Sequence, residues 1–139
     1  MGLIYANIEL INSDDLALVR RGYFAEDQVR RMIVNALVDS GAYMLAINEN
    51  LRHQLGLLSL DQQIAELADG SKIKLDIVGP VDVRFKNRAT TCRAMVLPGD
   101  SEILLGSIPM EDMDLLIDPK HQQLILNPQT PYIAKKPLK

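Results

Sequence analysis

The chain of 139 residues has a single cysteine, no tryptophan and only 4% aromatic residues. One cysteine excludes a disulfide bond within the chain. No apolar run approaches the ~20 residues that a membrane-spanning helix needs. No basic stripe with interleaved aromatic residues suggests nucleic-acid binding. The sequence therefore predicts a soluble globular protein with neither a membrane nor a nucleic-acid partner.

The remaining composition is that of one ordinary domain. Hydrophobic residues make up 47% of the chain, charged residues 24%, and the net charge is -3. Residues 1–5 lack the basic flank and apolar stretch of a secretory signal, so we expect a cytoplasmic location. We expect residues 1–128 to form the domain and residues 129–139, rich in proline and lysine, to form a tail outside the sheet.

An Asp-Ser-Gly tripeptide follows an apolar run in the first third of the chain. The run Met32–Val38 reads as a strand with at least one buried face, and Asp39, Ser40 and Gly41 come directly after it. A lone charge beside a buried strand is costly, so Asp39 is a candidate catalytic group. The same three residue types are favoured in turns, and a purely structural turn remains the alternative.

A second segment strengthens the catalytic interpretation. Leu104-Leu105-Gly106 reads as a short strand, and a short helix is expected from about Pro109 to Asp114. With both segments, the chain resembles the retropepsin-like aspartic proteases, in particular the bacterial, cyanobacterial-type members. In that family an Asp-Thr/Ser-Gly-Ala sequence follows an apolar strand and is backed by a hydrophobic-hydrophobic-Gly element. The resemblance extends from about Leu3 to Asn127.

This resemblance implies a mainly β fold, a small closed β-barrel with one or two short helices, assembled as a two-fold homodimer. It implies an aspartic endopeptidase that acts on peptide or protein substrates without a cofactor or metal. Two neighbouring carboxylates in such an enzyme share one proton and activate a water. The chain has one Asp-Ser-Gly, so the dyad would contain one Asp39 from each subunit.

The resemblance also assigns roles to individual residues. Asp39, Ser40 and Gly41 would form the catalytic loop, with the Gly41 N–H approaching the carboxylate and Ser40 bonding across the two-fold axis. Ala42 would contact substrate. The next position, often acidic in viral members, is occupied here by Tyr43.

A hairpin is expected about thirty residues after Asp39. The dipeptide Asp69-Gly70 suits a two-residue turn, and alternating half-buried strands are predicted at residues 72–77 and 81–85, separated by Gly79-Pro80. The resemblance places a mobile flap here, with Asp69 and Gly70 at the substrate. A plain surface hairpin is the alternative.

Other elements can be predicted from local signals. We expect strands at residues 3–11 and 16–19, a polar excursion at residues 20–28, and a helix that begins after Asn48 and ends at Gly56. A final pair of strands is expected at residues 115–117 and 124–126.

Several other chemistries fail on motif grounds. His53 and His121 have no ligand-spaced partners for zinc, and no Gly-rich phosphate loop follows a strand. Ser40 lacks the Gly-x-Ser-x-Gly context of a serine nucleophile. Cys92 and the methionines are better explained by packing. The remaining alternative function is a catalytically silent protease-fold dimer that binds peptides or partner proteins.

Overall fold

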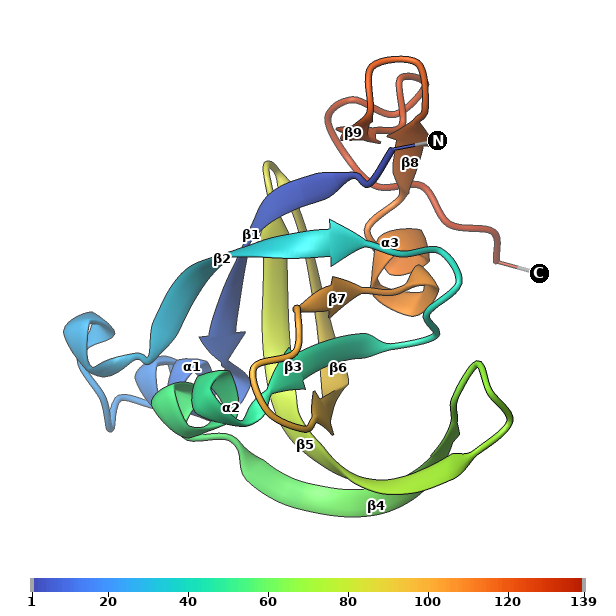
Figure 1. Cartoon of the computed structure of the whole chain (residues 1–139). Coiled ribbons are helices and arrows are strands. Elements are labelled where there is room, and N and C mark those ends of the chain that lie inside the picture. Colours follow the sequence, from blue (N-terminus) through green and yellow to red (C-terminus); the bar gives the residue numbers. More distant parts are fainter. Residues whose placement is uncertain (1, 139) are drawn as a thin grey trace.

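The computed structural model describes residues 2–138 and is mainly β, with a few short helices (Figure 1). Its strands are β1 (Tyr5–Asn12), β2 (Arg31–Val38), β3 (Leu45–Asn48), β4 (Leu58–Glu66), β5 (Lys72–Phe85), β6 (Arg88–Leu97), β7 (Leu104–Leu105), β8 (Leu115–Asp118) and β9 (Gln123–Leu126). Its helices are α1 (Ser13–Arg20), α2 (Glu49–Leu55) and α3 (Ser107–Asp112), with a single 3-10 turn at Glu26–Gln28.

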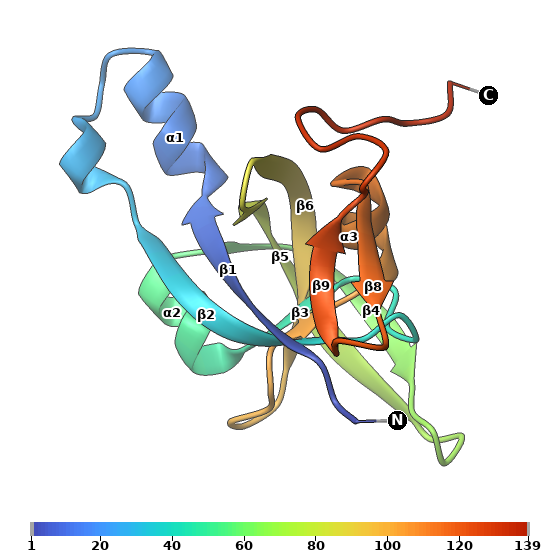
Figure 2. The ribbon, with the colours of Figure 1, turned by 90° about the horizontal axis from the view of Figure 1, so that it is seen from above.

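Seven of these strands form one mixed sheet in the order β1-β2-β7-β3-β6-β5-β4. β2 and β7 are parallel, as are β3 and β6, whereas β4, β5 and β6 form an antiparallel meander. β1 also pairs with β5 over residues 9–12, so the sheet curls round until its first strand meets the second strand from the opposite edge. The view from above shows the separate β8–β9 hairpin standing beside this sheet near α3 (Figure 2).

The core is formed by the inward-facing side chains of the sheet together with side chains of α2 and α3. Its fully buried side chains include those of Ile8, Leu10, Leu45, Ile47 and Met113. The period-two alternation predicted for residues 81–85 is confirmed, since the three apolar side chains point inward. Because side chains alternate along a strand, the residues between the buried ones point to the opposite face of the sheet.

Two details of β5 and its neighbours differ from prediction. The strand is continuous through Gly79-Pro80, with a register shift between Val78 and Val81 where two separate strands were expected. Residues 16–19, predicted as a strand, belong to α1. The Asn12 side chain accepts a hydrogen bond from the Asp15 N–H at 3.0 Å, and this N-cap decides the local structure. The apolar run at residues 16–19 is too short to distinguish the two-residue period of a strand from the 3.6-residue period of a helix.

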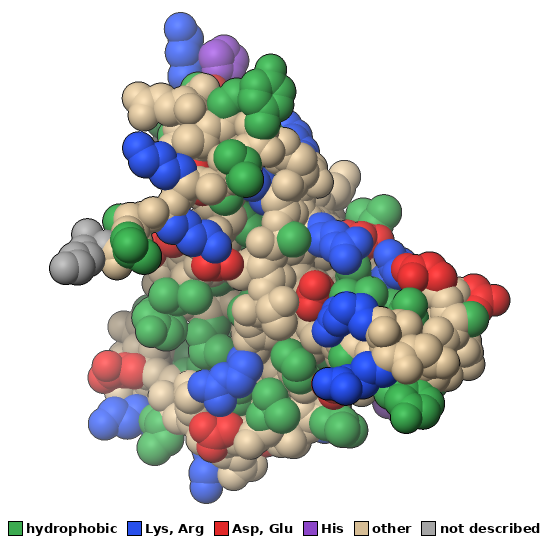
Figure 3. Space-filling model, turned by 180° about the vertical axis from the view of Figure 1, so that it is seen from behind, with side chains coloured by type: hydrophobic (Ala, Val, Ile, Leu, Met, Phe, Trp, Pro, Cys, Tyr) green, Lys and Arg blue, Asp and Glu red, His purple; other side chains and the backbone are tan. Residues whose placement is uncertain are grey.

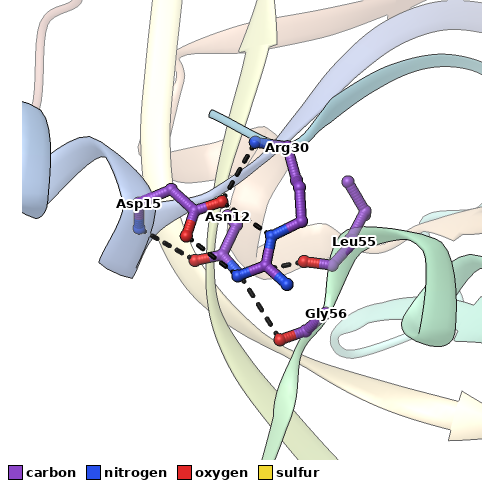
Figure 4. A network of polar contacts seen from close by, with 5 residues as sticks. All are labelled: Asn12, Asp15, Arg30, Leu55 and Gly56. Atoms are coloured by element: carbon purple, nitrogen blue, oxygen red, sulfur yellow. Dashed lines mark hydrogen bonds and ion pairs between the residues drawn. The ribbon is translucent and has the colours of Figure 1, made fainter. Parts of the chain in front are cut away.

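A polar network joins α1, β2 and the end of α2 (Figure 4). Asp15 is almost fully buried, and its carboxylate accepts two bonds from the Arg30 guanidinium, both at 2.9 Å, and one from the Arg30 N–H. The Asn12 amide donates to the carbonyl of Leu55 at 2.9 Å. Gly56 lies against Arg30, and an added Cβ would stand 1.8 Å from its Nη1 atom. The network replaces the water that these buried polar groups lose.

Two other predictions about local structure are confirmed, and a third is shifted along the chain. Asn48 caps α2 by accepting the Leu51 N–H, and Gly56 ends that helix in the left-handed conformation. The expected C-terminal pair of strands is β8 and β9. α3 begins at Ser107, two residues before the predicted start.

The C-terminal tail lies outside the strands but folds back on the domain. The carboxylate of Asp114 accepts bonds from the Thr130 hydroxyl at 2.6 Å and from the Lys135 N–H at 2.9 Å. Lys136 forms an ion pair with Asp112 at 3.0 Å. The tail is thereby held against the end of α3.

Candidate active site

Asp39 stands in the loop that follows β2. Its N–H donates to the carbonyl of Leu105 at 3.1 Å, and its own carbonyl accepts the Ala42 N–H at 3.1 Å. Its Oδ1 atom accepts the Gly41 N–H at 2.9 Å. The side chain is half-buried and Ser40 and Gly41 are exposed. The loop therefore holds a carboxylate in a fixed position at the surface.

β7 and α3 support this loop from behind. The N–H groups of Ser107 and Ile108 donate to the carbonyls of Ala42 and Tyr43 at 2.9 and 3.1 Å. Gly106 packs against the same backbone so closely that an added Cβ would lie 2.3 Å from the Met44 carbonyl oxygen. The contact explains why a glycine follows the two leucines.

A cavity of about 410 Å³ separates the Asp39 loop from the β4–β5 hairpin. Gly41 and Ala42 line it on the loop side, and residues 63–66 of β4 line it on the hairpin side. The other lining residues are largely apolar: Tyr43, Met44, Ala46, Met95, Leu97 and Leu104. The space has the mixed apolar and backbone lining that suits an extended peptide.

Asp39 and Ser40 line a different, smaller cavity of about 250 Å³. Its other walls are residues 2–4, residues 37–38 and Ile117. Leu3 is 67% exposed there, an apolar side chain beside the candidate catalytic loop. Within one chain, the structure thus places Gly41 and Ala42 in the cavity under the hairpin and places Asp39 next to the N-terminal strand.

The hairpin tip differs in detail from the predicted two-residue turn. The Leu67 N–H donates to the Ser71 carbonyl at 2.8 Å, which leaves Ala68, Asp69 and Gly70 as a three-residue loop. Gly70 has a φ of 85°, a conformation that favours glycine. Hydrogen bonds from Ser71 lower the pKa of Asp69. This loop type places a turn before a left-handed residue, a possibility that the dipeptide alone does not distinguish.

Asp69 and Gly70 are both exposed at the end of the hairpin, whereas the cavity wall is formed further down, by residues 63–66. Sequence reasoning missed this part of β4, together with Met95 and Leu97, and it assigned Leu104 to the element behind the loop and not to the cavity wall. The signal that could have found Met95 and Leu97 is their spacing of two residues in a predicted strand, which places both side chains on one face.

Residues 2–138 also bear on a metal site and on the single cysteine. Among residues 2–138, no group of three or more His, Cys, Asp or Glu side chains could hold a metal ion. Burial, with smaller contributions from Asp82 and Asp112, raises the pKa of the Cys92 thiol to about 12, so the thiol stays protonated and is a weak nucleophile. No helix in this part of the chain is long and apolar enough to cross a membrane.

Charge is distributed evenly over the surface seen from behind. Acidic, basic and hydrophobic side chains are interspersed there (Figure 3).

Comparison with curated proteins gives no match to this chain. A model of an aspartyl protease family matches residues 31–108. This range begins with β2, contains the Asp39 loop, the β4–β5 hairpin and β7, and ends in α3. The matched segment covers more than half of the sequence, so the chain belongs to an aspartyl protease family of the retropepsin-like clan.

Proposed function

We propose that the chain is a homodimeric aspartic endopeptidase that hydrolyses peptide bonds with a water activated between two Asp39 carboxylates, one from each subunit. The observation that carries the proposal is the position of Asp39. Its carboxylate is held by the Gly41 N–H, and the loop is pinned to Leu105 from behind. A fixed, half-buried carboxylate two residues from Gly41, which lines a peptide-sized cavity, fits what this chemistry needs.

In this mechanism the two carboxylates hold one proton between them. The ionised member accepts a proton from water as the water attacks the scissile carbonyl carbon. The protonated member donates to the carbonyl oxygen, so charge does not accumulate there. Gly41 keeps the ionised oxygen oriented, since its N–H donates to Oδ1 at 2.9 Å.

Assembly into a two-fold dimer is part of the proposal because each chain supplies one Asp-Ser-Gly. The exposed Leu3 and the cavity that it shares with Asp39 and Ser40 favour a partner subunit on this side. Ser40, exposed at the loop tip, is available to bond across the axis. The pairing of β1 with both β2 and β5 supports a closed barrel beneath the site.

A second candidate is a silent protease-fold dimer that binds peptides. The contact of Asp39 Oδ1 with the N–H two residues later is also what an Asp in a structural turn makes. In this case the cavity under the hairpin would hold a peptide that is not cut.

The discriminating experiment compares the wild-type protein with Asp39→Asn in a peptide-library cleavage assay at several pH values, with Asp100→Asn as a matched control. Asp100 is exposed in the loop after β6. We expect cleavage by the wild-type protein and the control, and a loss of at least about 10³-fold in kcat/KM for Asp39→Asn, since general acid–base chemistry contributes roughly that much.

Light scattering on the same samples measures the assembly. A dimer at micromolar concentration is expected. If a folded wild-type dimer binds peptides without cutting them, the silent binder is the function that remains. Near-native activity of Asp39→Asn would exclude the aspartic mechanism.

A further inference from the structure

A second compartment of about 420 Å³ adjoins the cavity under the hairpin. The two compartments share Tyr43, Met44 and Gln63 in their walls, so they are direct neighbours. The second compartment is the more polar of the two in its side chains, because Thr91 and Arg93 of β6 form part of its wall. Its remaining residues are Leu45, Cys92, Ile108 and Pro109.

Arg93 is the cationic group in this wall, and it is loosely held. Its Nη1 atom lies 3.9 Å from the Asp61 Oδ2 atom, beyond hydrogen-bond distance, and both side chains are about half exposed (47% and 52%). An ion pair of this kind contributes little stability. The guanidinium therefore keeps donors available for another acceptor.

Two other groups of this wall, Thr91 and Cys92, are less available to an anionic ligand. The Thr91 hydroxyl donates to Asp82 at 3.1 Å, and the Cys92 thiol stays protonated. Asp61 is the acidic group that faces Arg93, and it would compete with an incoming carboxylate. An acidic ligand must therefore gain more from the guanidinium than it loses by approaching Asp61.

Strand geometry relates this compartment to the apolar one. Asp61 is opposite Ile77 and Ile77 is opposite Met95, so these three lie in one row across the hairpin sheet. Arg93 precedes Met95 by two residues on β6 and shares its face. Side chains two apart in a strand are separated by about 7 Å, and an extended peptide has the same repeat.

We propose that Arg93 is a specificity-determining residue that selects an aspartate or glutamate in the substrate. This acidic residue lies two positions from the apolar residue that fills the compartment at Met95. The inference rests on the proposed function, because it requires an extended peptide in the cavity under the hairpin. Arg93 binds the carboxylate with its free donors, a bidentate geometry that guanidinium groups favour.

The test uses octapeptides with an apolar central pair, in which Glu, Gln or Lys is placed at each flanking position in turn. Cleavage by the wild-type protein gives kcat/KM, and binding to the Asp39→Asn protein gives Kd without chemistry. At one flanking position we expect the Glu peptide to have about fivefold higher kcat/KM and affinity than the Gln peptide, and the Lys peptide to have the lowest values. A difference of this size is what one exposed charge contact allows. The preference should decline at 1 M salt, where charges are screened.

Three variants test whether Arg93 causes this preference for Glu. Arg93→Gln should bring the Glu-to-Gln ratio to about one. Arg84→Gln, a matched control at an exposed arginine in the part of β5 that pairs with β1, should retain it. Asp61→Asn should raise the ratio because the competing carboxylate is gone.

The outcomes separate the two proposals. The role of Arg93 is overturned if Glu and Gln peptides give equal kcat/KM and Kd at every position. It is also overturned if the Glu-to-Gln ratio is the same in wild-type protein and Arg93→Gln. Both results leave the proposed function intact. Failure of every peptide to bind or be cleaved overturns the proposed function, and the inference about Arg93 with it.

Discussion

Gly106 lies directly against the backbone of Met44. An added Cβ at Gly106 would stand 2.3 Å from the Met44 carbonyl oxygen and 2.8 Å from its carbonyl carbon. The backbone of Gly106 is extended, with a φ of -86°, so the reason for glycine here is space and not conformation. The residue joins β7 to α3 exactly where both brace the Asp39 loop.

Gly106→Ala should therefore move the Met44 backbone and weaken the brace. We expect a loss of about 1–3 kcal/mol in the free energy of unfolding, the usual effect of overpacking. Urea denaturation measures it. Under the proposed function, activity on peptides should fall together with stability, since the start of α3 is hydrogen-bonded to the Asp39 loop. An unchanged unfolding midpoint would contradict the close contact.

The buried Asp15 carboxylate gives a second prediction. Its hydrogen bonds from Arg30 lower the pKa of Asp15, so the ionised form stabilises the fold above about pH 4 and this contribution is lost as pH falls further. Asp15→Ala removes the acceptor of three hydrogen bonds from Arg30, whose side chain is half exposed, and should cost about 1–3 kcal/mol. Chemical denaturation at pH 7 tests this. Asp14→Ala, next to it on the same helix, is the matched control and should change stability much less.

The sequence was sufficient for the site loop but not for its surroundings. Asp39, Gly41 and Gly106 are recognisable because short chemical patterns mark them, and local caps such as Asn48 are equally readable. The helix at residues 13–20 was not predicted, because the short apolar run at residues 16–19 was interpreted as a strand. The Asn12 side chain, which accepts the Asp15 N–H, favours a helix there instead.

The cavity walls depend on long-range register. Gln63 and Met95 come together because β4, β5 and β6 pair in a particular alignment, with Asp61 opposite Ile77 and Ile77 opposite Met95. A shift of one residue would turn every side chain to the other face. The register shifts at residues 59–61 and 78–81 alter that alignment. Gly79-Pro80 marks the second one in the sequence, whereas no local pattern marks the first.

The docked tail gives a third prediction. Hydrogen bonds from Thr130, from the Lys135 N–H and from Asn127 lower the pKa of Asp114 to about 2. Between about pH 4 and 2 the unfolded chain takes up a proton that the folded chain does not, so stability should decrease with falling pH in this window. Asp114→Asn should flatten this part of the profile, measured by urea denaturation at each pH.

The same variant should loosen the tail. Faster cleavage by an added protease within residues 129–138 is expected for Asp114→Asn, because the Lys135 N–H loses its ionic acceptor. Asp100→Asn serves as the control and should leave both measurements unchanged. Equal proteolysis in all three proteins would show that Asp114 does not hold the tail.

The β4–β5 hairpin should become ordered when peptide enters the cavity. Residues 63–66 line that cavity, while the tip at residues 67–71 is exposed and held by two backbone hydrogen bonds. Hydrogen exchange of the Asp39→Asn protein should slow across residues 63–71 on addition of an apolar peptide, with little change in β1. Protection that is unchanged at saturating peptide would make the hairpin a passive part of the sheet.

The pH profile of hydrolysis tests the shared proton between two subunits. If the two Asp39 carboxylates form a dyad, the forms with no proton and with two protons are both inactive, so kcat/KM should follow a bell-shaped curve that rises below neutral pH and declines in stronger acid. The acid limb must be separated from unfolding, because Asp15 and Asp114 both stabilise the fold less as pH falls. Circular dichroism at each pH makes this separation. A profile that rises steadily to pH 9 in a folded dimer would contradict a dyad that needs one proton.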